Sequence, residues 1–149
     1  MDRRAFLILL IAVLIGLGIS VYSFAHNRAF VSGEFCTLSE TFNCDIVNRG
    51  PFSQVGGVSI ALVGVIGYAF LLIGTLLKWR KPADRSLTIF LLIASLGGFL
   101  FSVYLTGIEA FVLKTWCLLC LTSQAVITIT LGCAVWLWRQ ERTAKDLQS

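Results

Sequence analysis

The sequence predicts an all-α membrane protein, a four-transmembrane-helix bundle with one long extracytoplasmic loop between its first and second helices. Of the 149 residues, 57% are hydrophobic and only 13% are charged, against about 25% charged in an ordinary globular protein. This number of charges is too small to cover a water-facing surface. We therefore expect lipid to surround much of the chain. The apolar residues also gather in four long segments, which supports the same prediction.

The four apolar segments cover residues 5–25, 55–77, 87–113 and 115–138 approximately. Each exceeds the roughly 20 residues that a helix needs to cross about 30 Å of hydrocarbon. None alternates apolar and polar residues as the strands of a membrane barrel do. We therefore expect the whole chain, residues 1–149, to form a single membrane domain.

The first apolar segment has some features of a signal peptide. Arg3 and Arg4 precede it, and small residues stand at its end, at Ser23 and Ala25. Its uncharged run is nevertheless longer than the roughly 7–15 residues of a signal-peptide core. A retained membrane helix is the preferred interpretation.

Lysine and arginine predict the orientation of the bundle. With four spans both termini share one side, and nine of the 12 basic residues fall on that side, whereas three fall on the other. The positive-inside rule then places both termini in the cytoplasm. No basic stripe with interleaved aromatic residues is present, so nucleic acid is not an expected partner. The nine residues are Arg3, Arg4, Lys78, Arg80, Lys81, Arg85, Arg139, Arg142 and Lys145, and the three are Arg28, Arg49 and Lys114.

A CxxC motif, Cys117 to Cys120, opens the fourth apolar segment. A dithiol at this spacing does redox or metal chemistry, and on a helix positions i and i+3 share a face. Thr115 is a candidate N-cap, which would place Cys117 in the first helical turn. The helix N-terminus favours a thiolate there, while the apolar residues between the two cysteines oppose it.

A second cysteine pair, Cys36 and Cys44, lies in the long loop. The predicted topology places both pairs at the same, oxidising membrane face, where disulfides persist, and so suggests a path for electrons. Two permanent disulfides or a four-cysteine zinc site are alternatives. Zinc sites favour two closely spaced pairs, and only one pair here has that spacing, so we expect no metal. Cys133 falls deep in the fourth segment, away from the others.

Several polar residues stand inside or beside the apolar segments. Gln124 lies on the face of the CxxC cysteines, where it would either bond a ligand carbonyl or link two helices, since a buried amide is costly without a partner. Glu109 is expected to be an interfacial carboxylate, and His26 a solvated interface residue. A stripe of small residues in the third segment is read as a helix-packing surface; its members are Ala94, Gly98, Ser102 and Thr106.

The order of these features resembles the vitamin K epoxide reductase family. The resemblance rests on Cys36-x7-Cys44 in the loop, a glycine-rich start to the second segment, and Cys117-x2-Cys120 at the outer end of the fourth. The stretch 52–68, with Gly56, Gly57, Gly64 and Tyr68, is similar to the family's second-helix signature. The resemblance covers residues 6–138 approximately, and it implies a bacterial DsbB-like homologue in the inner membrane.

The resemblance implies a function for each of the four cysteines. Cys36 would exchange with a separate periplasmic thioredoxin-fold protein of the DsbA-like kind. Cys44 would attack a Cys117–Cys120 disulfide, and Cys120 would then pass electrons to a quinone, ubiquinone or menaquinone. The chain would thus support disulfide bond formation as a quinone-dependent thiol–disulfide oxidoreductase.

Three positions depart from the family pattern. Gly50 stands where many members have Ser or Thr, so a hydroxyl role there would be lost or moved to Ser53. By alignment, Ile60 and Gln124 replace the Asn and Tyr that bond the quinone in vertebrate members, and they are the candidate quinone-pocket residues. A quinone or quinone-epoxide reductase proper, and a structural membrane subunit stapled by two disulfides, remain the alternatives.

Overall fold

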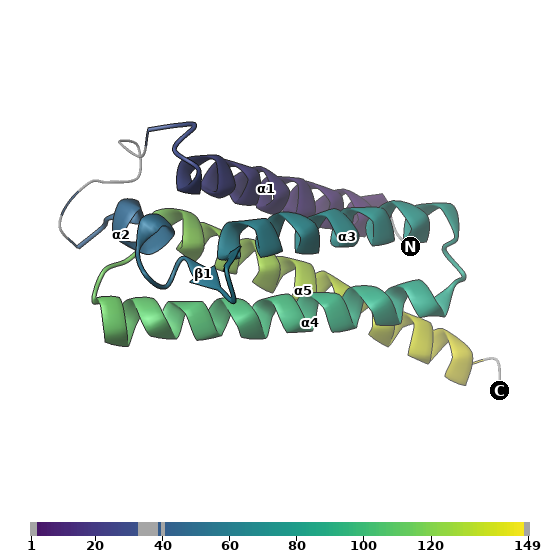
Figure 1. The fold of residues 1–149 in the computed structure, drawn as a ribbon. Coiled ribbons are helices and arrows are strands. Elements are labelled where there is room, and N and C mark those ends of the chain that lie inside the picture. Colours follow the sequence, from purple (N-terminus) through teal and green to yellow (C-terminus); the bar gives the residue numbers. More distant parts are fainter. Residues whose placement is uncertain (1–2, 33–38, 40, 148–149) are drawn as a thin grey trace.

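Four long helices form an elongated bundle in the computed structural model, which describes residues 3–32, 39 and 41–147 (Figure 1). They are α1 (Arg3–Asn27), α3 (Ile60–Arg80), α4 (Arg85–Ile108) and α5 (Leu118–Asp146). A π-helical turn, η1 (Glu109–Leu113), extends α4 without a break. All four helices are long and apolar enough to cross a membrane, so the predicted all-α, four-helix membrane architecture is confirmed.

The helices pack through narrow apolar faces. α1 lies against α3 and α5, and α4 lies against α5 and α3. On α1 the buried positions recur every three or four residues and include Leu9 and Val13, whereas Ile8, Ile11 and Ile15 are about half exposed. That pattern is typical of a helix with one face to its neighbours and the other to lipid. The first apolar segment is therefore an integral helix of the bundle.

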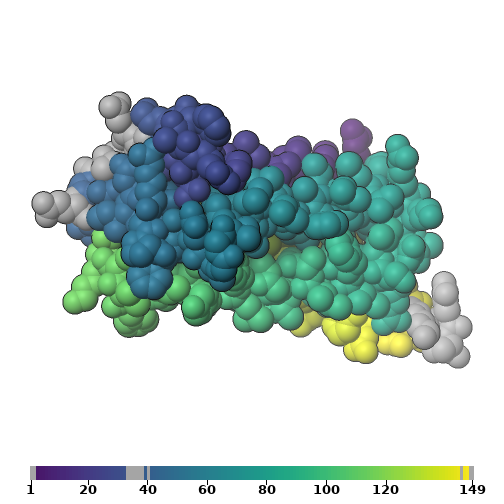
Figure 2. Space-filling model, in the orientation of Figure 1, coloured from purple at the N-terminus to yellow at the C-terminus, as the bar shows by residue number. Residues whose placement is uncertain are grey.

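The short elements that follow α1 and precede α3 in the sequence cover one end of the bundle. They are α2 (Cys44–Arg49) and a hairpin of β1 (Gln54–Val55) and β2 (Val58–Ser59). Figure 2 shows these blue segments above the green end of α4, at the end of the molecule away from both termini. We call this the cysteine end, because Cys44 and Cys117 lie there.

The hairpin shortens the helix that the second apolar segment predicts. Gly56 and Gly57 have φ values of 60° and 82°, and two consecutive residues with positive φ form the tight turn that matches strand twist. Hydrophobicity continues through Val55 and Val58, but their backbone pairs as strands. α3 therefore begins at Ile60 rather than near residue 55.

The opposite end is held by a buried ion pair. Lys78 is 1% exposed; its Nζ donates to the carbonyls of Pro82 and Asp84, at 2.8 and 2.9 Å, and pairs with Glu141. Thr88 Oγ1 also donates to Glu141, at 2.8 Å. These bonds join α3, α4 and α5 where their apolar segments end, which explains why α3 and α5 continue past the residues predicted as spans.

Candidate active site

A parallel backbone bridge brings the loop cysteine to the CxxC motif. Phe42 pairs with Trp116; the Asn43 N–H donates to the Trp116 carbonyl at 3.2 Å, and the Trp116 N–H donates to the Thr41 carbonyl at 2.8 Å. Cys44 and Cys117 follow closely after the bridged pair in their own segments. Their sulfur atoms lie 3.3 Å apart, and both residues are 0% exposed.

Cys44 is the first residue of α2. The side chain of Asn43 caps this helix by accepting from the N–H groups of Asp45 and Ile46, at 3.0 and 3.4 Å. Cys44 is disulfide-bonded, whereas Cys117 and Cys120 are free thiols. Cys36, the predicted point of exchange with a partner, lies outside the described residues.

Cys117 itself, rather than Thr115, is the N-cap of α5. The helix begins at Leu118; the Cys117 carbonyl accepts from the Leu121 N–H at 3.0 Å, and its sulfur accepts from the Cys120 N–H at 3.4 Å. This is the bonding of an N-cap residue. The N-cap prediction for Thr115 was wrong because η1 and Lys114, which has a φ of 50°, delay the start of the helix.

The capping position affects the reactivity of Cys117. Hydrogen bonding from the Cys120 thiol, aided by the Cys120 backbone N–H, lowers the pKa of the Cys117 thiol below its ordinary value. Burial and the Glu109 carboxylate raise that pKa, but by less. A thiolate is the attacking species in disulfide exchange, so the sulfur nearest Cys44 is also the one best prepared to react.

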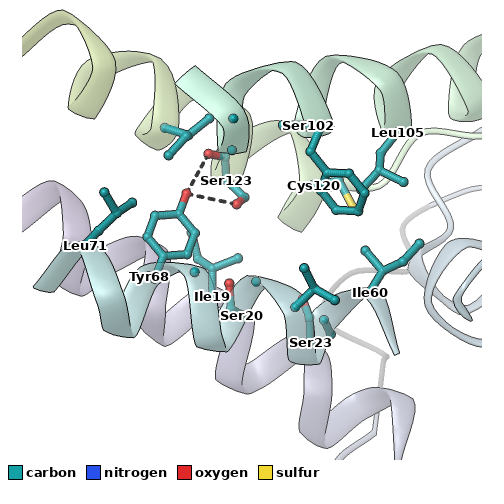
Figure 3. A pocket seen from close by; sticks show the side chains of 18 of the residues that line it. Ile19, Ser20, Ser23, Ile60, Tyr68, Leu71, Ser102, Leu105, Cys120 and Ser123 are labelled. Carbon is teal, nitrogen blue, oxygen red and sulfur yellow. Dashed lines mark hydrogen bonds between the residues drawn. The ribbon is translucent and has the colours of Figure 1, made fainter. Parts of the chain in front are cut away.

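Cys120 lines a large cavity between the four helices. The cavity has a volume of about 530 Å³ and is mostly apolar, within the usual range for a small-molecule site. Figure 3 shows Cys120 and Ile60 at one end of it and Tyr68 with Leu71 towards the other. The CxxC motif therefore has one sulfur against the loop and the other against the cavity.

Tyr68 closes part of the cavity wall. Its hydroxyl bonds both the carbonyl and the side-chain oxygen of Ser123, at 3.1 and 3.2 Å (Figure 3). Its ring fills the space that a side chain on α1 would need, because a Cβ at Gly16 would lie 2.1 Å from Tyr68 Cε1. The glycine thus permits the close packing of α1 on α3 at the cavity.

The two candidate quinone-pocket residues have different surroundings. Ile60 lines the cavity, but Gln124 is not among its lining residues. The Gln124 side-chain oxygen instead accepts from Thr106 and, at 3.2 Å, from Ser102, which gives the interhelical link weighed as one of its two roles. The small-residue stripe to which Ser102 and Thr106 belong packs on α5 and also lines the cavity.

Two polar residues expected at the solvated interface are buried. Glu109 is 2% exposed, and its Oε2 accepts from the Cys117 N–H at 3.0 Å. His26 is 1% exposed, and its Nε2 lies 2.9 Å from Oδ1 of Asp45 in α2. The solvated environment expected for His26 was wrong because the capping segments cover the cysteine end, and they bury Glu109 as well. A carboxylate so close to a CxxC inside an apolar segment is a signal that could have identified Glu109 as a candidate site residue.

The structure also describes the surroundings of Gly50, Ser53 and Cys133, which the sequence analysis singled out. A Cβ at Gly50 would lie 2.1 Å from the Ile46 carbonyl oxygen, so this turn has no room for the family's Ser or Thr. Ser53 is buried three residues later. Cys133 packs against the apolar core of the bundle, far along α5 from Cys117 and Cys120.

A comparison with protein families matches residues 7–135 to the vitamin K epoxide reductase family. The chain belongs to this family. Membership indicates a membrane oxidoreductase with thiol–disulfide and quinone chemistry, in agreement with the paired sulfurs and the cavity. None of the curated proteins matches the chain.

Proposed function

We propose that the chain is a quinone-dependent thiol–disulfide oxidoreductase that supports disulfide bond formation outside the cytoplasm. Electrons would enter from a separate periplasmic thioredoxin-fold partner at Cys36 and Cys44, cross to Cys117 and Cys120, and leave to a quinone. The nine-to-three distribution of basic residues supports cytoplasmic termini, and the membrane would be a bacterial inner membrane. The cysteine end would then face the periplasm.

The observation that carries this proposal is the 3.3 Å separation of the Cys44 and Cys117 sulfurs. Reacting atoms in productive complexes lie about 3–3.5 Å apart, and this pair is held there by the backbone bridge at Phe42 and Trp116. Two permanent structural disulfides would not require the sulfur atoms of different pairs to lie this close together.

The sulfur chemistry balances over two exchanges. The partner's dithiol reduces the loop disulfide and is itself oxidised. The Cys44 thiolate then attacks Cys117 of a Cys117–Cys120 disulfide, which releases Cys120 as a thiolate; attack by Cys36 on Cys44 restores the loop disulfide and frees Cys117. The end state has a disulfide between Cys36 and Cys44 and thiols at Cys117 and Cys120.

The large cavity fits a quinone ring at Cys120. Its wall is mostly apolar, as an aromatic ring requires, and the hydroxyl group of Ser20 is among the polar groups that could orient one. A bound quinone supplies a two-electron, two-proton acceptor. The chain's part is to exclude water and to hold Cys120 at the cavity wall while Cys117 stays within reach to form the disulfide.

The proposal is tested by trapping the relay intermediate. In Cys120→Ala the Cys117 thiolate can attack Cys44 of the loop disulfide, and only the released Cys36 can reverse this. Rapid alkylation, which blocks Cys36, followed by non-reducing peptide mapping should therefore find a Cys44–Cys117 disulfide. The double variant Cys117→Ser/Cys120→Ala is the matched control and should show none. If Cys117 is recovered fully alkylated in Cys120→Ala, the two sulfurs do not exchange and the relay fails, which would favour the disulfide-stapled subunit.

A turnover assay then separates the enzymatic alternatives. Purified protein with a reduced thioredoxin-fold partner and a short-chain quinone should form quinol, and Cys120→Ala should abolish this. Replacing the quinone with its epoxide tests a quinone-epoxide reductase. Epoxide turnover faster than quinone turnover would contradict the proposal that the quinone is the main electron acceptor.

A further inference from the structure

A second, smaller cavity adjoins the large one at the cysteine end. It has a volume of about 40 Å³ and lies under α2 and the hairpin, beside η1. The two cavities share part of their walls, so they are neighbours. The shared residues are Asn48, Ile60, Ala61, Leu105 and Cys120.

Three buried polar atoms around the small cavity have no hydrogen-bond partner within the described part of the chain. They are Asn48 Nδ2, Ser59 Oγ and Glu109 Oε1, and all three residues line the cavity. Ser59 is the N-cap of α3, yet its hydroxyl makes no capping bond. Buried polar groups are almost always bonded to protein or ordered water, and 40 Å³ exceeds the roughly 10–15 Å³ that one water needs. The cavity therefore has the room and the bonding groups that one water needs.

Glu109 connects this water site to the reacting sulfurs. Its Oε2 accepts from the Cys117 N–H, and Glu109 and Cys120 both line the small cavity. No salt bridge to Glu109 occurs among residues 3–32, 39 and 41–147. A carboxylate at 2% exposure without a cation is costly inside an apolar span, so a structural role alone explains its presence poorly.

We propose that Glu109 is the acid–base catalyst of Cys120, and that a water held by Asn48 and Ser59 connects it to the large cavity. This inference rests on the proposed relay, because it assigns the proton transfer that accompanies electron transfer from Cys120. Glu109 shares the small cavity with the reacting thiol, and its Oε1 has no other hydrogen-bond partner among the described residues, so it is available to take the thiol proton.

The step balances in protons and electrons. The Cys120 proton passes to the Glu109 carboxylate, and the electron pair of the broken S–H bond stays on sulfur. As the Cys117–Cys120 bond forms, two electrons leave the sulfur pair for a quinone in the large cavity. Glu109 returns its proton through the water, and the Cys117 proton follows the same path, so two thiols and a quinone become a disulfide and a hydroquinone.

The first test needs no quinone. The infrared S–H stretching band of Cys120, assigned by its loss in Cys120→Ser, should lie at lower wavenumber than that of Cys133, for which the described residues provide no hydrogen bond. Glu109→Gln should move the Cys120 band towards the Cys133 band. Coincident bands in the unmodified protein would overturn the proposal without any variant having to fold.

The second test is a single turnover. Pre-reduced protein is mixed with a short-chain quinone, and Glu109→Gln should slow quinol formation about 10²–10⁴-fold, the usual contribution of general acid–base catalysis. The amide oxygen can still accept from the Cys117 N–H. Glu141→Gln, the same change at the opposite end of the bundle, is the control and should leave this rate unchanged.

A milder variant tests the water site. Ser59→Ala removes a hydroxyl that caps nothing and should slow the same step about 2- to 10-fold, the effect of one hydrogen bond. If unmodified protein forms no quinol, the proposed function fails. If it forms quinol and Glu109→Gln forms it as fast, the relay stands and the role of Glu109 is wrong.

Discussion

Gly16→Ala is the sharpest test of how the cavity wall is built. The added Cβ would lie 2.1, 2.3 and 2.7 Å from the Cε1, Cζ and Cδ1 atoms of Tyr68, whereas carbon atoms pack at about 3.5–4.0 Å. The ring would have to shift by more than 1 Å, which would break its hydroxyl bonds to Ser123.

The magnitude follows from the two effects. Overpacking costs about 1–3 kcal/mol, and the lost hydrogen bonding costs about 0.5–1.5 kcal/mol more. Gly18→Ala is the matched control, because it lies on the same helix and nothing approaches its Cβ within 4 Å. Both variants gain the same helix propensity, so their unfolding free energies should differ by about 2–4 kcal/mol, with Gly16→Ala the less stable.

The assay is equilibrium or thermal unfolding of the two variants in the same detergent. Tyr68→Ala should relieve the clash, so the double variant Gly16→Ala/Tyr68→Ala should lose less stability than the sum of its single changes. Equal stability of Gly16→Ala and Gly18→Ala would refute the close packing of α1 on Tyr68, and with it this wall of the cavity.

Three other predictions concern single residues of α5 and its N-cap. In a Cys44→Ala background, alkylation of Cys117 should titrate below the ordinary thiol pKa, and adding Cys120→Ala should move that pKa upward, since the main lowering interaction is removed; an unchanged midpoint would contradict this. Gln124→Leu should cost about 0.6–1.7 kcal/mol of unfolding free energy, as membrane interhelical bonds do, with the KM for quinone unchanged; a raised KM would restore Gln124 as a quinone contact. Cys133→Ser should leave turnover unaltered, and a large loss would mean that Cys133 takes part in the relay.

Hydrophobicity predicted the existence of the four helices better than it predicted where each helix begins and ends. The four spans were predictable because each must satisfy its backbone internally in lipid, and apolar length alone reveals this. The ends were not, because Val55 and Val58 are as apolar in a strand as in a helix. Only the paired positive φ values at Gly56 and Gly57 decide between the two.

The candidate site was likewise predictable from the sequence in part. The CxxC spacing and the loop pair predicted a dithiol relay, and topology predicted that Cys44 and Cys117 share a membrane face. The burial of Glu109 and His26 depends on segments distant in sequence folding over them, so local polarity pointed to the wrong environment.

By itself the sequence determined the class of the protein: a four-helix membrane bundle with two cysteine pairs at one end, since lipid dictates apolar length and redox chemistry dictates paired thiols. Only the tertiary structure decided the contact of Cys44 with Cys117, the N-cap role of Cys117, and the position of Cys120 between a large apolar cavity and a small polar one. These depend on a backbone bridge between residues about 70 apart in the chain, and no local pattern encodes such a contact.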